Sequence, residues 1–139
     1  MLTCSLIGSS PRNKKLSRPP IAIVEDDLAV RRAYSDLFSS YDCETVIFPT
    51  AEEFLEYVAD HKVACLILDQ RLPGMSGLEL QGLLRERDVT FKTVFITSQD
   101  DDITKAKAME AGATAFFSKG SDIDDIIAGV MRVAGYDFD

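Results

Sequence analysis

The chain has 139 residues, of which 46% are hydrophobic and 27% charged, which is typical of one globular domain and excludes a disordered or fibrous protein. Its net charge is −8, but residues 1–20 hold four basic residues and no acidic one, which leaves 11 basic against 23 acidic residues elsewhere. The acidic part of the chain after residue 20 repels a phosphate backbone, and we therefore expect that it does not bind nucleic acid directly.

The same composition bears on location and redox state. No stretch approaches the ~20 apolar residues of a membrane span. A secretory signal has its basic residues before its apolar segment, whereas in this chain the basic cluster comes after the apolar first residues. Cys4, Cys43 and Cys65 are odd in number and lack metal-ligand spacing, which indicates free thiols in a reducing compartment. We expect a cytoplasmic protein without a membrane partner.

Residues 1–19 are rich in serine, proline and basic residues and carry no hydrophobic period. We expect a flexible N-terminal arm there, followed by a single domain over residues 20–139.

Strand-like and helix-like patterns alternate five times from residue 21 onward. A strand at about 20–25 precedes a helix at 28–40, whose apolar residues recur at helical spacing: Val30, Tyr34, Leu37, Phe38 and Tyr41. A more peripheral strand at 43–48 leads to a helix at about 50–60, opened by a capping box from Thr50 to Glu53. The run at 63–68 is the most apolar, which predicts the central strand.

The second half continues the alternation. A second capping box, from Ser76 to Glu79, opens a helix reaching about residue 87, and a strand follows at 91–96. Asp100 to Asp102 favour a helix N-terminus, and Gly112 is a natural place for that helix to end. A strand at 114–118 and a helix beginning at Ser121 complete the pattern. That last helix has one apolar face: Ile123, Ile126, Ile127, Val130 and Val133.

Five such units predict an α/β fold, a doubly wound five-stranded parallel sheet with five helices and strand order 2-1-3-4-5. Parallel sheets place their sites at the carboxyl ends of strands, and the switch point lies between the first and third strands. Four strands end there at polar residues, in chain order Glu25-Asp26, Asp69, Thr97 and, after Ser118, Lys119. We expect these side chains to share one rim.

These residue types suit phosphoryl chemistry. Three converging carboxylates, Glu25, Asp26 and Asp69, repel one another unless a cation binds, and Mg²⁺ prefers such oxygen ligands. Asp69 can attack phosphorus as a nucleophile. Thr97, the backbone N–H of Ser98, and Lys119 can bind the phosphoryl oxygens. For the residues singly, a structural role remains open: Glu25 to Asp27 could simply cap the following helix.

The chain from about residue 20 to 134 resembles the receiver domain of two-component response regulators, a flavodoxin-like fold. Four motifs carry the resemblance: IVEDD (23–27), LDQRLPGMSGLEL (68–80), FITSQ (95–99) and AGATAFFSK (111–119). The resemblance implies that Asp69 accepts a phosphoryl group from a sensor histidine kinase or a histidine phosphotransfer protein. Glu25 and Asp26 match the Mg²⁺-binding acid pair, and the backbone carbonyl of Arg71 matches a further metal ligand.

The resemblance also assigns switch and tuning positions. Thr97 matches the switch hydroxyl, Lys119 the phosphate-binding lysine, and Phe116 the aromatic residue that turns inward with the hydroxyl. Arg71 and Gln99 occupy positions that tune the lifetime of the phosphoryl group. The family usually has proline after the lysine, often with a cis bond before it. Gly120 stands there instead, and since a non-proline cis bond costs about 2.5–4 kcal/mol, we expect a trans peptide and a looser loop.

Two other functions remain as alternatives. A haloacid-dehalogenase-type phosphatase also uses an aspartate, Mg²⁺, a hydroxyl and a lysine, but it needs a second acid two residues after the nucleophile, where this chain has Arg71. A receiver-like interaction module that takes no phosphate is the second alternative. Neither G-x-G-x-x-G nor a P-loop occurs, which disfavours nucleotide binding.

The resemblance predicts a signalling phosphoacceptor, not an enzyme acting on a separate substrate, although it assists its own phosphoryl transfer and dephosphorylation. We expect the output surface to comprise the fourth helix, fifth strand and fifth helix, contacting a downstream protein or a second copy of the chain. The motif LPGMSG (72–77) occurs in receivers that precede a DNA-binding domain. The chain is therefore either a stand-alone regulator or part of a longer one.

Overall fold

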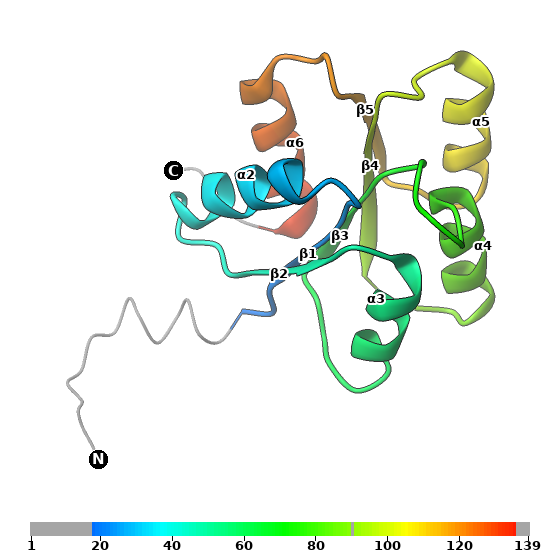
Figure 1. Ribbon diagram of the computed structural model, residues 1–139, viewed down its shortest axis with the longest axis horizontal. Helices are drawn as coiled ribbons and strands as arrows, with labels where there is room; N and C mark the ends of the chain where they lie inside the picture. The colour runs from blue at the N-terminus through cyan, green and yellow to red at the C-terminus, as the bar shows by residue number, and fades with distance from the viewer. Residues whose placement is uncertain (1–17, 90, 136–139) are drawn as a thin grey trace.

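The structure is a computed structural model, and it describes residues 18–89 and 91–135. Five strands alternate with five helices (Figure 1). In chain order they are β1 (Ile21–Val24), α2 (Leu28–Ser39), β2 (Thr45–Phe48), α3 (Ala51–Val58), β3 (Cys65–Leu68), α4 (Gly77–Glu86), β4 (Lys92–Thr97), α5 (Asp102–Glu110), β5 (Ala115–Ser118) and α6 (Ile123–Ala134). The predicted arm at 1–19 lies outside the described residues except for Arg18 and Pro19, and Cys4 also lies outside them.

The strands form one parallel sheet in the order β2-β1-β3-β4-β5, as predicted. β3 lies at the centre, and its four residues are all buried, which agrees with its unbroken apolar sequence. β2 is an edge strand with no fully buried residue. The strand order changes direction between β1 and β3, because β2 lies on one side of this pair and β4 and β5 lie on the other. A site is expected at the carboxyl ends of strands at such a switch point.

Helices cover both faces of the sheet (Figure 1). Alternate strand residues point to opposite faces, so that Ile21 and Ile23 pack under α2 and α6, whereas Ala22 and Val24 pack under α3, α4 and α5. Each face forms its own apolar layer. The two layers hold the strand ends in fixed register beneath the predicted site.

Several local predictions were wrong in detail. Tyr41 lies beyond the end of α2 and is 42% exposed, and Ile123 at the start of α6 is 46% exposed. Ser121 does not begin the last helix, because Asp122 is its N-cap and accepts the N–H of Asp124. Helix edges therefore expose apolar residues that helical spacing alone assigns to the core.

The two predicted capping boxes have different outcomes. At α4 the box is complete, since Ser76 accepts the N–H of Glu79 and Glu79 accepts the N–H of Ser76. At α3 the Thr50 hydroxyl oxygen accepts the N–H of Glu53, but the Glu53 carboxylate binds the Thr50 hydroxyl at 3.4 Å instead of the backbone. The helix end near Gly112 is confirmed, with Gly112 at φ +103°.

Cys43 and Cys65 are buried thiols that are not joined in a disulfide. Burial raises the pKa of the Cys65 thiol to about 12, and the nearby Cys43 adds to this. None of the helices among residues 18–89 and 91–135 combines the length and the hydrophobicity that a membrane span requires.

Candidate functional site

The polar residues that end the strands are placed by the sheet itself. The ladder of hydrogen bonds continues one residue past β1 and β3, with the N–H of Glu25 donating to Phe48 O (3.1 Å) and that of Asp69 to Val24 O (3.2 Å). Beyond β5, the N–H of Lys119 donates to Thr97 O at 3.0 Å. The backbone at these positions is therefore held by the same kind of hydrogen bonds as the strands that precede it.

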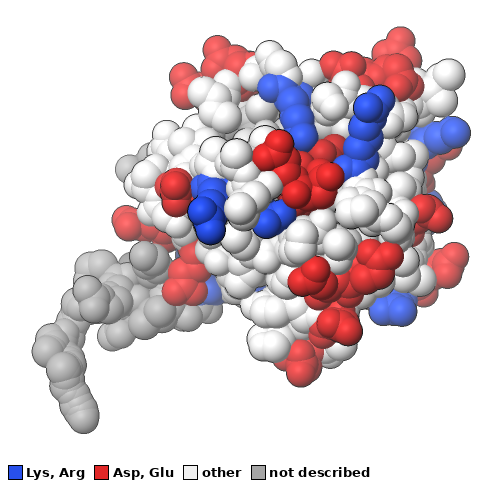
Figure 2. Space-filling model, viewed as in Figure 1, with Lys and Arg blue, Asp and Glu red and all other residues white. Residues whose placement is uncertain are grey.

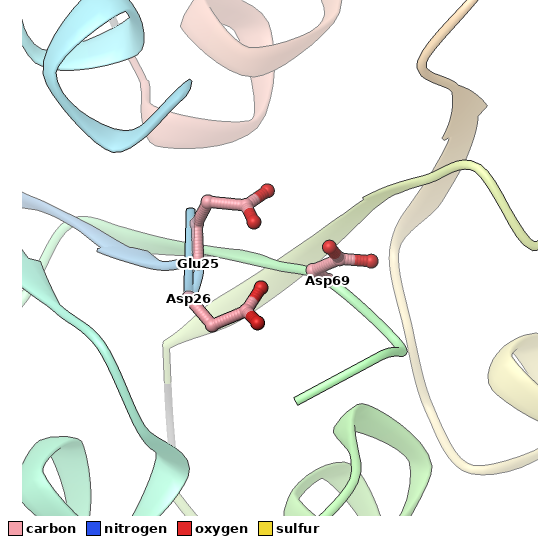
Figure 3. Close-up of side chains that lie close together, drawn as sticks. All are labelled: Glu25, Asp26 and Asp69. Atoms are coloured by element: carbon pink, nitrogen blue, oxygen red, sulfur yellow. The ribbon is translucent and has the colours of Figure 1, made fainter. Parts of the chain in front are cut away.

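Three carboxylates converge at this rim (Figure 3). Ligand atoms of Glu25, Asp26 and Asp69 lie within 4.8 Å of one another. Glu25 and Asp69 are only 3% and 4% exposed, whereas Asp26 is open to solvent. Carboxylate oxygens of this kind are hard ligands with one open side, so this donor set fits Mg²⁺.

Lys119 forms ion pairs with two of these carboxylates. Its Nζ lies 2.8 Å from Glu25 Oε1 and 2.9 Å from Asp69 Oδ2. Burial lowers the pKa of Lys119, but its hydrogen bonds to the two carboxylates outweigh this, and the net pKa lies above its usual value. Burial raises the pKa of Glu25, and the charge of Asp69 adds to it, although Lys119 opposes both. At neutral pH Lys119 is charged.

Thr97 lies at the end of β4 and is fully buried. Its hydroxyl oxygen accepts the N–H of Gln99 at 3.1 Å, which orders the loop beyond the strand. Ser98, between them, is exposed. On the neighbouring strand, Phe116 is half-buried and stacks on Phe95 with ring centroids 5.9 Å apart. The predicted switch residues thus lie on the two adjacent strands β4 and β5.

Arg71 follows Asp69 by two residues in the same loop and also contacts the loop after β4. Its backbone N–H donates to Asp69 Oδ1 at 3.3 Å, and its side-chain Nε donates to Gln99 Oε1 at 3.3 Å. The two predicted tuning residues, Arg71 and Gln99, therefore contact each other. Acidic side chains gather near the centre of this face, with Lys and Arg side chains on both sides (Figure 2).

The structure adds Gly77, to which the sequence patterns assigned no role in the site. The N–H of Gly77 donates to Gln70 O at 3.0 Å, and a Cβ at Gly77 would lie 2.4 Å from the carbonyl oxygen of Asp69. The N–H of Leu78 donates to Gln70 Oε1 at 2.7 Å. The first turn of α4 thus packs directly on the backbone of Asp69, and the glycine directly after the Ser76 cap is the sequence signal for it.

Arg31 on α2 is a second residue that sequence patterns did not single out. Its Nη1 donates to the carbonyl oxygens of Glu25 at 2.7 Å and Asp26 at 3.3 Å. The Arg31 guanidinium therefore holds the backbone of Glu25 and Asp26 in place through their carbonyl groups. A basic residue one turn into a helix has no distinctive pattern, so only the fold reveals this contact.

Residues 21–131 match the family model of the response regulator receiver domain. The chain belongs to the response regulator receiver family. Members of this family are the receiver domains of response regulators, the signalling proteins of two-component systems. The match places the chain in this family and not among haloacid-dehalogenase phosphatases.

Curated relatives include nodulation protein W of Bradyrhizobium diazoefficiens, 32% identical over 130 residues that cover 94% of this chain and 57% of that protein. The response regulator protein TmoT of Ectopseudomonas mendocina is 40% identical over 114 residues, covering 82% of this chain and 51% of TmoT. This receiver therefore spans about half the length of these relatives.

Solved structures share the fold. The response regulator StyR is 34% identical, with a TM-score of 0.74 over 84% of this chain and 59% of that one. The BeF₃-activated receiver domain of RstA from Klebsiella pneumoniae is 27% identical, with a TM-score of 0.79 over 84% of this chain and 98% of that one. The five-stranded sheet and its helices are thus those of known receivers.

Proposed function

We propose that Asp69 is the phosphoacceptor of this receiver and takes a phosphoryl group from a phosphohistidine of a sensor kinase or phosphotransfer protein. The observation that carries the proposal is the placement of Lys119 between Glu25 and Asp69, 2.8 and 2.9 Å from their oxygens. This arrangement holds a nucleophilic carboxylate, a cation and two further acids in one half-open site. A residue that only caps a helix would need neither the lysine nor the other carboxylates beside it.

The transfer makes one bond and breaks one. A carboxylate oxygen of Asp69 attacks phosphorus, the P–N bond to the donor imidazole breaks, and the imidazole leaves with that electron pair. The product is a mixed anhydride between Asp69 and phosphate. Lys119, already beside Asp69 Oδ2, provides positive charge for the phosphoryl oxygens as the group arrives. The hydroxyl of Thr97 and the N–H of Ser98 donate to the remaining oxygens.

Glu25, Asp26 and Asp69 would hold a Mg²⁺ ion, with the Arg71 carbonyl as a further ligand. When bound, the ion supplies positive charge that offsets the repulsion between carboxylates and phosphate. Arg31 keeps the acid pair in place through its bonds to the Glu25 and Asp26 carbonyls. The chain's own residues thus provide both the ligands and their support.

The output surface in this proposal comprises α5, β5 and α6. Thr97 and Phe116 connect the site to it, since they lie on the two strands next to α5 and α6. Ile103 and Met109 on α5 are 68% and 42% exposed, which suits contact with a downstream protein or a second copy.

The test is incubation with Mg²⁺ and acetyl phosphate, followed by intact-mass measurement. We expect the wild type to gain one phosphoryl group only when Mg²⁺ is present, and the Asp69→Asn variant to gain none. Asp60→Asn, at an exposed position after α3, is the matched control and should behave as wild type. Equal gain in Asp69→Asn would overturn the assignment, and no gain in the wild type would favour the interaction module.

A further inference from the structure

A chain of side-chain hydrogen bonds joins the loop after Asp69 to the start of α5. Arg71 Nε donates to Gln99 Oε1 at 3.3 Å, and Gln99 Nε2 donates to Thr104 Oγ1 at 3.2 Å. The Thr104 hydroxyl in turn donates to Asp101 Oδ2 at 2.9 Å. Three of these four side chains come from the segment after β4, and one comes from the segment after β3.

The direction of every bond in this relay is set by its ends. Arg71 can only donate, so the amide oxygen of Gln99 must face it, and the amide nitrogen must face Thr104. Asp101 as a carboxylate can only accept, so the Thr104 hydroxyl must give its proton to Asp101 and accept from Gln99. With a cation at one end and an anion at the other, the bonds polarise one another in the same sense.

Thr104 is the residue on which the relay depends. Its side chain is only 4% exposed, and a hydroxyl is the group that can accept from an amide and donate to a carboxylate at once. Its backbone N–H makes a separate bond to Asp101 Oδ1 at 2.8 Å, which caps α5. The cap is independent of the hydroxyl, so α5 keeps its N-terminal cap when the hydroxyl is removed.

We propose that Thr104 is a positioning residue that holds Gln99 against Arg71. The hydrogen bonds from Arg71 through Gln99 to Thr104 then form a bridge, called the bar below, between the loops that carry Asp69 and Thr97. β3 and β4 are neighbours in the sheet, and the bar joins their loops just past the strand ends. Because the backbone N–H of Arg71 donates to Asp69 Oδ1, the bar lies directly beside the carboxylate and would lie across one approach of water to a phosphoryl group on it. The inference rests on the proposed function of Asp69, and it assigns a role in the lifetime of its phosphoryl group to a residue that touches none of the reacting atoms.

Hydrolysis of the phosphoryl group forms one bond to phosphorus and breaks one. The oxygen of a water molecule attacks phosphorus, the bond between phosphorus and Asp69 breaks, and inorganic phosphate leaves while the Asp69 carboxylate is restored. The bar limits the approach of that water. Releasing Gln99 from Thr104 also releases Arg71, and the opening between the loops widens.

The first experiment follows the decay of phosphorylated protein by intact mass after removal of acetyl phosphate. In Thr104→Val, which keeps the shape but lacks the hydroxyl, we expect hydrolysis to be roughly fivefold faster, the effect of losing one net hydrogen bond. Thr104→Ser keeps the hydroxyl and should retain the wild-type rate. Thr93→Val is the matched control, because Thr93 is equally buried but lies near the opposite end of β4, and it should not change the rate.

The second experiment needs neither phosphate nor Mg²⁺. The Nε–H proton of Arg71, observed by NMR in the unphosphorylated protein, should exchange with water faster in Thr104→Val and at the wild-type rate in Thr104→Ser. An unchanged hydrolysis rate or an unchanged exchange rate in Thr104→Val would overturn the inference. If the wild type takes no phosphate, the proposed function fails, but the exchange measurement still decides whether Thr104 holds Arg71 through Gln99.

Discussion

The loop after Asp69 and the loop after Lys119 are built in opposite ways. In the first, α4 packs so closely that a Cβ at Gly77 would lie 2.4 Å from the Asp69 carbonyl oxygen. In the second, a Cβ at Gly120 would meet only Ser118 Oγ, at an ordinary 3.6 Å. Steric packing therefore fixes the nucleophile, whereas the lysine is placed by its two carboxylate partners and by its backbone bond to β4.

Gly77→Ala should have the largest effect, because it forces a methyl group onto the backbone of Asp69. We expect the free energy of unfolding to fall by about 1–3 kcal/mol and phosphorylation to be slowed, since the carbonyl of Asp69 must move. Urea denaturation and phosphorylation rates measure the two effects.

Gly82 provides the matched control for Gly77, since it lies in the same helix with nothing within 4 Å of a Cβ. Gly82→Ala should stabilise the protein by about 0.5–1 kcal/mol and leave phosphorylation unchanged. Equal behaviour of the two variants would contradict a sterically fixed nucleophile.

Lys119→Ala tests the electrostatic side of the comparison. It leaves the buried Glu25 and Asp69 facing each other without a cation, so we expect the free energy of unfolding to fall by about 1–2 kcal/mol. Mg²⁺ should restore part of the loss, because it binds the same carboxylates. Denaturation with and without Mg²⁺ measures this, and Lys105→Ala, at an exposed position on α5, should show neither effect. A loss that Mg²⁺ does not reduce would speak against the shared carboxylates.

The binding of Mg²⁺ should depend on pH because of Glu25. Burial raises the pKa of Glu25 above 4.5, so a proton competes with the ion up to a higher pH than for an ordinary glutamate. As pH rises through this raised pKa, the proton leaves and the Kd for Mg²⁺ should fall. An NMR titration with Mg²⁺ at a series of pH values above 4.5 measures it, with Glu25→Gln expected to bind more weakly and with a shallower pH dependence. The same pH dependence in both proteins would show that Glu25 is not the group responsible.

Gly120→Ala should have the smallest effect. The φ of Gly120 is not positive, and the Lys119–Gly120 peptide is trans, as the sequence predicted, so an alanine fits without strain. We expect the free energy of unfolding to change by less than about 0.5 kcal/mol, with phosphorylation unchanged. A large loss of phosphorylation would mean that this loop, not the carboxylates, places Lys119.

The sequence predicted the sheet order and the shared rim because both follow from short-range patterns. Apolar runs mark buried strands, and parallel strands bring their ends together, so the approach of Asp69 and Lys119 across 50 residues needed no further information. The contacts of Arg31 and Thr104 could not be predicted in this way. Their partners are set by how a helix end meets a loop from another unit, and neither leaves a periodic pattern in the sequence.

The failures have the same origin. Ile123 fits the helical period of α6 but lies beyond the layer that the sheet can cover, so it is exposed. Glu53 fits a capping box, yet its carboxylate binds the hydroxyl of Thr50 instead of the backbone. In both cases the local pattern is correct, and the surroundings decide which contact forms.

The assignment of Asp69 as phosphoacceptor is tested most directly by locating the phosphoryl group. Protein treated with acetyl phosphate and Mg²⁺ is reduced with borohydride, which converts an aspartyl phosphate to homoserine, and peptides are sequenced by mass spectrometry. We predict homoserine at position 69 and at no other aspartate. Homoserine at Asp26 or elsewhere, with Asp69 intact, would contradict the assignment.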